Sequence, residues 1–397
     1  MNRPIAIADN VHWVGVNDRD TDLFESLWPL PRGISYNSYL IADKKTALID
    51  TVKDTYAADY VSHLRELVGE DAGIDYLVVN HLEPDHSGTI PALLDHFPDL
   101  TVVGNKKTAR FLQELYGAGA RVQTVEDGEQ LELGTTTLQF HLTPMVHWPE
   151  TMMTYDRNHR ILFSGDAFGT FGALDGGLFD DEIDVDRYED ETRRYFANIV
   201  AKYAKMVQKA LAKLSDLDIA VIAATHGPVW RDSPQTIVGM YDRLSRQETE
   251  PGVVVAYASM YRNTEGMMEA VVRQLAEKGV RAICVHDLAR SHVSYVLRDV
   301  WRYRALIIGT PTYDTGVFPA VQSFINFLDI KKPAGRLLGL FGTCGWSGGG
   351  VKGLKAFAEN SDFELIEPVA EACFRPGEKD LDAARQMAAA VAERTRP

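Results

Sequence analysis

Short apolar runs alternate with polar turns through the first part of the chain. Val11 to Val16, Ser35 to Ile41 and Thr46 to Asp50 have the composition of β-strands. Lys44-Lys45, between the last two runs, is typical of a hairpin tip. The pattern therefore predicts a sheet, and it argues against a helical bundle.

Later apolar runs end just before a His or an Asp. These runs are Tyr76 to Val79, Leu138 to Leu142, Ile161 to Phe163 and Ile219 to Ala223. They alternate with helical periodicity at Tyr56 to Leu67 and at Tyr195 to Leu214. We expect a mixed α/β region with functional side chains at the ends of its strands.

The pattern changes near residue 250, after the polar stretch from Ser245 to Gly252. Strands and helices then alternate regularly: strand Val253 to Tyr257, helix Glu265 to Lys278, strand Ala282 to Val285, strand Ala305 to Gly309, helix Ala320 to Leu328, strand Leu337 to Gly342, helix Val351 to Asn360 and a last helix from Lys379. This order is typical of a doubly wound parallel sheet, whose ligands bind beyond the carboxyl ends of its strands. We predict one domain over residues 1–249 and a second over residues 250–397.

Composition narrows the class of protein. The chain has 397 residues, of which 45% are hydrophobic, enough for the cores of two or three domains. A formal net charge of −15 disfavours nucleic acid as a partner, because phosphate contacts need clustered Lys and Arg. There is neither a membrane-length apolar run nor a signal-peptide pattern, so a cytoplasmic protein without a membrane partner is expected. The cysteines Cys284, Cys344 and Cys373 form no CxxC pair, and we expect reduced, mostly buried thiols.

The most informative segment is His81-Leu-Glu-Pro-Asp-His86, directly after a strand-like run. His81 and His86 offer imidazole nitrogens, while Glu83 and Asp85 offer hard oxygens that can bridge two cations. Alone, each residue has a structural explanation, such as Asp85 capping the following helix. Four potential ligands on one short loop instead favour a dinuclear metal site.

Three later residues stand in the same setting at strand ends, namely His147, Asp166 and His226. The order H-x-E-x-D-H, His, Asp, His resembles the ligand set of the metallo-β-lactamase superfamily. Hydrolases of that fold usually carry His where this chain has Glu83. A carboxylate there favours iron or manganese over zinc, since oxygen ligands prefer harder ions.

With that carboxylate, the chain resembles the flavodiiron proteins. The similarity extends to the segments Gly33 to Ile41, His147-Trp-Pro-Glu150 and Tyr195 to Val200. The resemblance implies an N-terminal metallo-β-lactamase-like αββα sandwich and a C-terminal flavodoxin-like parallel sheet. It implies that one iron is held by His81, Glu83 and His147, the other by Asp85, His86 and His226, with Asp166 bridging both and Tyr195 as an outer hydrogen-bonding residue. Whether His86 binds iron stays open, because some relatives have this histidine displaced from the metal.

Three loops at strand ends of the second domain suit a flavin. Ser259-Met260-Tyr261-Arg262-Asn263-Thr264 places hydroxyls and free N–H groups at a helix start, where a phosphate binds. Thr310-Pro311-Thr312-Tyr313 and Thr343-Cys344-Gly345-Trp346-Ser347 offer small residues that admit a flat ring, and each also has an aromatic residue. The dinucleotide signature G-x-G-x-x-G does not follow the first strand, so FMN is the expected flavin.

The resemblance implies an oxidoreductase that reduces dioxygen to water, nitric oxide to nitrous oxide, or both, and the sequence does not choose between them. No rubredoxin-type cysteine pairs are present, so an external donor is expected: a rubredoxin, a flavin reductase or a reduced deazaflavin. Family members pair head to tail, which implies a homodimer here, or a tetramer built from it.

Two other functions remain as alternatives. A dinuclear zinc hydrolase with a fused flavodoxin domain would share most of the ligand set, and Glu83 counts against it. A non-enzymatic electron carrier with a structural metal site would share the flavin loops, and the full set of seven ligand residues counts against it.

Overall fold

The computed structural model describes residues 4–69, 73–117 and 119–395. Within these residues the chain packs as two compact units. The first comprises residues up to Phe196 and Tyr203–Ser245, and the second comprises Ala197–Lys202 and everything from Arg246 onward.

One sheet of the first unit has the strand order β1-β2-β7-β8-β9-β10-β11. Its strands are β1 (Ile5–Ala8), β2 (Val11–Trp13), β7 (Tyr39–Ile41), β8 (Ala47–Ile49), β9 (Tyr76–Val78), β10 (Thr101–Gly104) and β11 (Arg121–Thr124). Pairing is antiparallel from β1 to β8 and parallel from β8 to β11. The hairpin expected around Lys44-Lys45 is confirmed by the β7–β8 pairing.

A second sheet has the order β12-β13-β14-β15-β16. Its strands are β12 (Gln130–Glu132), β13 (Thr137–Leu142), β14 (Met152–Asp156), β15 (Ile161–Gly165) and β16 (Val221–Ala224). Buried side chains from both sheets, among them Ile49, Val78, Phe140 and Phe163, form one hydrophobic core. The two sheets therefore face each other as a sandwich, because apolar faces are stable only when they pack together.

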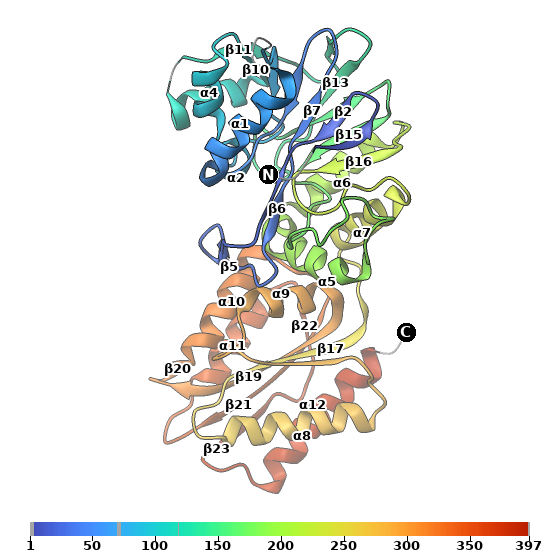
Figure 1. Ribbon diagram of the computed structural model, residues 1–397. Coiled ribbons are helices and arrows are strands. Elements are labelled where there is room, and N and C mark those ends of the chain that lie inside the picture. The colour runs from blue at the N-terminus through green and yellow to red at the C-terminus, as the bar shows by residue number, and fades with distance from the viewer. Residues whose placement is uncertain (1–3, 70–72, 118, 396–397) are drawn as a thin grey trace. The chain divides into compact units, whose positions relative to one another are not determined.

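Helices and short strands complete the first unit (Figure 1). The helices are α1 (Ala57–Val68), α2 (Pro84–Ser87), α3 (Ile90–His96), α4 (Lys106–Tyr116), α5 (Asp186–Tyr195), α6 (Ala204–Leu214) and α7 (Pro234–Ser245). Small antiparallel pairs form between β3 (Val16–Asp18) and β6 (Ile34–Tyr36), and between β4 (Leu23–Phe24) and β5 (Trp28–Pro29). With α4 packed on β10 and β11, and α6 against α7, the unit has the expected αββα layers.

Three sequence-based element predictions were wrong in detail. The apolar run from Val11 to Val16 divides between β2 and β3, which belong to different sheets. The run from Ser35 to Ile41 likewise divides into β6 and β7, because Asn37 turns aside to donate from Nδ2 to the carbonyls of Ala224 and Gly227. The helix expected from Tyr195 to Leu214 is interrupted by a π-helical turn at Phe196–Val200, where the chain packs as part of the second unit.

The second unit is a parallel sheet with the order β18-β17-β19-β21-β22, and β23 extends the β22 position beside β21. Its strands are β17 (Glu250–Tyr257), β18 (Ile283–Asp287), β19 (Tyr303–Tyr313), β20 (Gly316–Val317), β21 (Leu337–Cys344), β22 (Glu364–Leu365) and β23 (Ala370–Cys373). The doubly wound parallel order confirms the flavodoxin-like fold.

Helices cover both faces of this sheet. They are α8 (Asn263–Glu277), α9 (Val293–Arg302), α10 (Pro319–Lys331), α11 (Gly350–Glu359) and α12 (Glu378–Thr395). In Figure 1, α8 and α12 pack together on one face, and α9, α10 and α11 lie on the other. In the described part of the chain, no helix is long and apolar enough to cross a membrane.

Candidate metal centre and flavin cleft

The loop of residues 81–86 leaves β9 and leads into the short helix α2. Glu83 is in extended backbone, and Pro84 occupies the first turn, where its missing N–H costs nothing. Thr51 fixes the end of the loop, since its N–H and its hydroxyl donate to the His86 carbonyl at 2.9 and 2.8 Å. These contacts hold the loop backbone at His86, from which its imidazole side chain extends.

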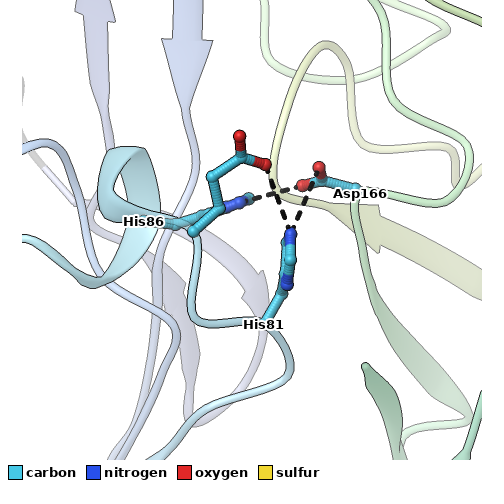
Figure 2. Close-up of side chains that lie close together, drawn as sticks. His81, His86 and Asp166 are labelled. Atoms are coloured by element: carbon cyan, nitrogen blue, oxygen red, sulfur yellow. Dashed lines mark hydrogen bonds and ion pairs between the residues drawn. The ribbon is translucent and has the colours of Figure 1, made fainter. Parts of the chain in front are cut away.

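His81, Glu83 and His147 form one cluster, together with one oxygen of Asp166. Figure 2 shows His81 and His86 pointing toward the carboxylate of Asp166. Glu83 Oε2 lies 3.3 Å from His81 Nε2 and 3.0 Å from His147 Nε2. Asp166 Oδ2 lies 3.0 Å from His147 Nε2 and 4.0 Å from His81 Nε2. Imidazole nitrogens and carboxylate oxygens thus converge on one small volume.

A second cluster contains Asp85, His86 and His226 with the other oxygen of Asp166. His86 Nε2 lies 3.3 Å from Asp85 Oδ1 and 3.0 Å from Asp166 Oδ1. His226 Nε2 lies 3.3 Å from Asp85 Oδ2 and 3.5 Å from Asp166 Oδ1. His86 therefore points into the cluster, and the two oxygens of Asp166 face the two clusters separately.

The charges in the site are balanced between imidazoles and carboxylates. Burial lowers the pKa of His147, but hydrogen bonds with Asp166 and Glu83 outweigh it and raise this pKa to about 9. Burial likewise lowers the pKa of His226, while Asp85 and Asp166 raise it to about 9. Burial also raises the pKa of Asp166, but the surrounding histidines hold it well below the usual value. In the absence of metal, protons on the histidines balance the carboxylate charges. Bound cations would take over this role, because metal ligands bind in their deprotonated form.

Several buried atoms of this site make no well-directed hydrogen bond to a described residue, although the Asp85 carboxylate and Nε2 of His86 and of His226 lie within the ion-pair distances given above. They are both carboxylate oxygens of Asp85, both ring nitrogens of His86, Nε2 of His226 and the hydroxyl of Tyr195. Buried polar atoms left unpaired cost about 1–3 kcal/mol each, so such a group calls for a ligand. Metal ions fit the donor set of these clusters.

Outer contacts orient the ligand-type histidines. His81 Nδ1 is 2.7 Å from Glu150 Oε1, which also accepts from the Leu82 N–H at 3.0 Å. His226 Nδ1 is 2.8 Å from the carbonyl oxygen of Ser35. Such partners select the tautomer that leaves Nε2 free for a metal. Sequence reasoning assigned no role to Glu150, although it closes the His147-Trp-Pro-Glu segment.

Tyr195 lies beside the second cluster at the end of α5. Its ring centroid is 5.8 Å from that of His226 and 5.1 Å from that of Phe171. In the sequence, this residue was expected to form hydrogen bonds around the irons. Its buried hydroxyl has no protein partner among the described residues, so it is free to donate to a group bound at the site.

A cavity of about 270 Å³ opens beside the metal-type ligands. Glu83 and Asp85 line it, together with residues of the β4–β5 hairpin that include Phe24 and Glu25. Glu25 Oε2 accepts from Trp28 Nε1 at 2.9 Å, which fixes the carboxyl on the hairpin tip. Sequence reasoning assigned no role to Glu25. A small molecule entering this cavity meets both clusters.

In the second unit, a cleft of about 530 Å³ lies at the carboxyl ends of the parallel strands. Its lining includes these predicted residues: Met260, Tyr261, Asn263, Thr264, Pro311, Thr312, Tyr313, Thr343, Cys344, Gly345, Trp346 and Ser347. Asp314, Thr315 and Phe374 also line it and were not predicted. Ser259, Arg262 and Thr310 are absent from the lining: the Ser259 hydroxyl accepts from the Glu265 N–H, Arg262 pairs with Glu265, and the Thr310 hydroxyl donates to the Pro311 carbonyl.

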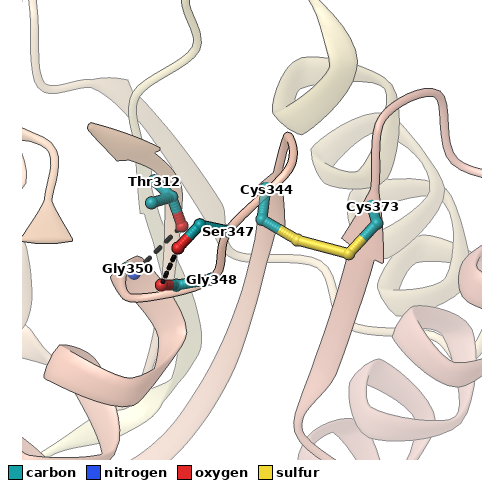
Figure 3. The surroundings of a disulfide bond; sticks show 6 residues. All are labelled: Thr312, Cys344, Ser347, Gly348, Gly350 and Cys373. Carbon is teal, nitrogen blue, oxygen red and sulfur yellow. Dashed lines mark hydrogen bonds between the residues drawn. A yellow bond between two sulfur atoms is a disulfide. The ribbon is translucent and has the colours of Figure 1, made fainter. Parts of the chain in front are cut away.

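Hydrogen bonds between loops hold the cleft together. The hydroxyls of Thr264 and Thr343 are 2.8 Å apart and join the first and third loops. Thr312 Oγ1 accepts from the Gly350 N–H at 3.0 Å and joins the second loop to the start of α11 (Figure 3). Open space surrounds Gly345, where an added Cβ would meet nothing within 4 Å. A cleft with these small residues beside a helix start fits a flat ring and a phosphate.

The prediction of three reduced thiols was wrong for two of them, because Cys344 and Cys373 form a disulfide (Figure 3). They are the last paired residues of β21 and β23, in direct register across parallel strands. The 29-residue separation between them gave no sign of this register in the sequence. Cys284 is free and half-buried, as expected.

Two families of known proteins match separate parts of the chain. The family described as ODP family beta lactamase matches residues 34–227. The family described as flavodoxin matches residues 255–387. Together these two matches include every residue of the metal-type clusters and of the flavin cleft.

Relatives extend over almost the whole chain. The anaerobic nitric oxide reductase flavorubredoxin of Escherichia coli is 32% identical over 98% of this chain and 82% of its own length. The rubredoxin oxygen:oxidoreductase of Desulfovibrio gigas is 29% identical with a TM-score of 0.95, covering 99% of this chain and 98% of its own. The flavodiiron protein of Giardia intestinalis is 28% identical with a TM-score of 0.92, covering 100% and 99%. Identity and coverage at this level show that the chain is an oxidoreductase and belongs to the flavodiiron protein family.

Proposed function

We propose that this protein reduces a diatomic gas, dioxygen or nitric oxide, at a diiron centre that receives its electrons through FMN. The single observation that carries the proposal is the position of Asp166, whose two oxygens face two separate clusters of imidazoles and carboxylates. A carboxylate shared in this way suits two metal ions held side by side.

The ligand assignment follows the two clusters. His81, Glu83 and His147 would hold one iron, and Asp85, His86 and His226 would hold the other. The approach of His86 Nε2 to Asp166 Oδ1, at 3.0 Å, supports including His86. When bound, the irons supply electrons and open coordination positions, and the flavin supplies further electrons.

The protein itself positions and shields the reacting gas. The small cavity beside Glu83 and Asp85 limits entry to small molecules. Tyr195 keeps an unpaired hydroxyl beside His226, in position to donate a hydrogen bond to the reacting gas. Reduction of dioxygen to water consumes four electrons and four protons, and reduction of two nitric oxide molecules to nitrous oxide and water consumes two of each.

The flavin cleft receives the electrons from outside. The start of α8 would hold the phosphate of FMN, and the loops of residues 310–313 and 343–347 would hold its ring. The donor is a separate protein or cofactor: a rubredoxin, a flavin reductase or a reduced deazaflavin. The relative from Desulfovibrio gigas is named for rubredoxin, which favours the first of these.

The names of two relatives support either dioxygen or nitric oxide as the substrate. The protein of Escherichia coli is named a nitric oxide reductase, and that of Desulfovibrio gigas an oxygen oxidoreductase. A dinuclear zinc hydrolase is the alternative; Glu83 counts against it, because it makes the first cluster richer in hard oxygen ligands, and metal analysis of the purified protein would separate the two functions. We place the protein in the cytoplasm as a head-to-tail homodimer.

Purified protein is expected to contain about two irons and one FMN per chain, because two ligand clusters and one flavin cleft are present. Fully reduced protein mixed anaerobically with each gas in a stopped-flow instrument should reoxidise its flavin within the mixing experiment for at least one gas. Equal volumes of gas-free buffer are the control. Two zincs per chain with hydrolase activity, or flavin that neither gas reoxidises, would contradict the proposal.

Gly349→Ala is expected to weaken FMN binding and to destabilise the second unit by about 1–3 kcal/mol, the usual cost of overpacking. An added Cβ at Gly349 would collide with the backbone carbonyl of Thr315, which lines the cleft. Gly348→Ala is the matched control, since its Cβ would lie 3.5 Å from Glu371, an ordinary contact. Flavin fluorescence after dilution and thermal unfolding measure the two effects. Equal FMN retention in both variants would show that the close contact between Gly349 and the Thr315 carbonyl does not shape the cleft.

A further inference from the structure

The disulfide between Cys344 and Cys373 borders the flavin cleft on two sides. Cys344 itself lines the cleft, and the residues that follow it, Gly345 to Ser347, continue the same wall. Phe374, directly after Cys373, lines the cleft from the neighbouring strand. The bond therefore joins two separate segments of the cleft wall at the point where each leaves the sheet.

The two sulfur-bearing residues differ in accessibility. Cys344 is buried, with 7% of its surface exposed, whereas Cys373 lies in the exposed part of β23. The segments that follow the two cysteines carry highly exposed apolar residues. Trp346 is 94% exposed, and Phe374 is 63% exposed. Attack on a disulfide depends on access to one sulfur and on a leaving group at the other. Cys373 offers the access, and Cys344 is the leaving group.

We propose that the Cys344–Cys373 pair is a thiol-exchange site at which a low-molecular-weight dithiol controls the flavin cleft. One thiolate of the dithiol attacks Sγ of Cys373, the S–S bond breaks, and Cys344 leaves as a thiolate. The second thiol of the reagent then displaces Cys373 from the mixed disulfide. The reagent is oxidised by two electrons to its disulfide, the protein pair gains those electrons, and the two protons of the reagent pass to the two cysteines.

Reduction of the disulfide removes the covalent link between the two segments of the cleft wall. β21 and β23 pair in register from Phe341 with Ala370 to Cys344 with Cys373. At the end of this pairing, the two segments are held together by the disulfide and by the hydrogen bond from the Phe374 N–H to the Cys344 carbonyl, at 2.6 Å. β22 and β23 form the edge of the sheet, and among the described strands β23 pairs only with β21. No further described strand therefore holds β23 on its other side. After reduction, FMN binding has to order both segments again, and affinity falls by the cost of that ordering. This inference rests on the proposed function, because it assigns FMN to the cleft.

The test uses holoprotein purified without thiols and then treated with dithiothreitol. Alkylation followed by mass spectrometry should label Cys344 and Cys373 only after treatment. Dilution monitored by flavin fluorescence should then show FMN affinity weaker by roughly tenfold, the effect of ordering one or two extra side chains. Cys373→Ser should bind FMN at this weaker level with or without dithiothreitol. Cys284→Ser is the matched control, because Cys284 lies on β18 at the opposite edge of the sheet, and it should retain the full shift.

Alkylation of both cysteines before treatment, or a pair that dithiothreitol does not open, would overturn the exchange site. A pair that opens while FMN affinity stays the same would overturn control of the cleft and leave the proposed function intact. Protein that binds no FMN in either state would overturn the proposed function together with cleft control. The three failures are therefore distinguishable in one set of samples.

Discussion

Asp166→Asn is expected to abolish reduction of dioxygen and nitric oxide while FMN absorbance stays normal. The substitution keeps the size of the side chain and an oxygen that accepts from the Thr225 hydroxyl, now 2.7 Å from Oδ1. It removes the negative charge and replaces one of the oxygens that face the two clusters. Loss of an outer-sphere partner of a metal ligand already costs about 10–100-fold, so loss of the shared ligand should cost at least about 100-fold in turnover. Stopped-flow reoxidation and iron analysis measure the two consequences.

A buried aspartate of the same sheet provides the control. Asp156 lies at the end of β14, where it accepts hydrogen bonds from the Asn158 and His159 backbones at 2.9 and 3.1 Å and has no contact with the ligand clusters. Asp156→Asn should therefore retain turnover even if it lowers the melting temperature. If Asp166→Asn reduced either gas at a near-normal rate, the assignment of a shared ligand would be wrong.

The positions of the metal-type residues follow from a local rule that sequence shows well. His81 follows β9, Asp166 follows β15 and His226 follows β16 by two residues, because polar residues cannot continue a buried strand. β9 belongs to one sheet of the sandwich, and β15 and β16 belong to the other. Residues that follow strands ending at the same edge lie close together. For these residues, periodicity and residue type indicated the strand-end positions, and the resemblance to a known family supplied their assignment as ligands.

Other features depend on register and on long-range packing, which the sequence does not display. The run Ser35 to Ile41 reads as one strand, yet Asn37 turns the chain between two sheets because its amide reaches the carbonyls on both sides of His226. Cys344 and Cys373 become neighbours only through the β21–β23 register. Glu25 reaches the small cavity only because a tight hairpin carries it there. Each depends on a partner far away along the chain.

A mixture of two inactive variants is expected to recover gas reduction if flavin and irons cooperate between subunits. Asp166→Ala with His226→Ala removes ligands of the diiron centre and leaves the flavin cleft unchanged. Thr264→Glu places a carboxylate at the start of α8, where it repels the phosphate of FMN, and it also removes the hydroxyl that contacts Thr343 at 2.8 Å. Each variant alone should be inactive, the first without iron and the second without flavin.

Recovery depends on how electrons travel in a dimer. If the flavin of one subunit serves the irons of its partner, a mixed dimer contains one intact flavin paired with one intact diiron centre. Activity per mixed dimer should then approach half that of the wild-type dimer, because one of its two pairings is complete. If electrons pass within one chain, every chain carries one damaged site, and mixing recovers nothing.

Co-expression with two different affinity tags allows the mixed dimer to be isolated by sequential purification. Its iron and FMN contents should each be about half those of the wild type, which establishes that one intact site of each kind is present. A further control joins all three substitutions on one chain and pairs it with a wild-type chain. That dimer also holds one intact site of each kind, but both lie on the same chain, so it should be inactive if transfer is between subunits and active if transfer is within one. Isolated mixed dimers with the expected cofactors and no activity would reject the head-to-tail arrangement.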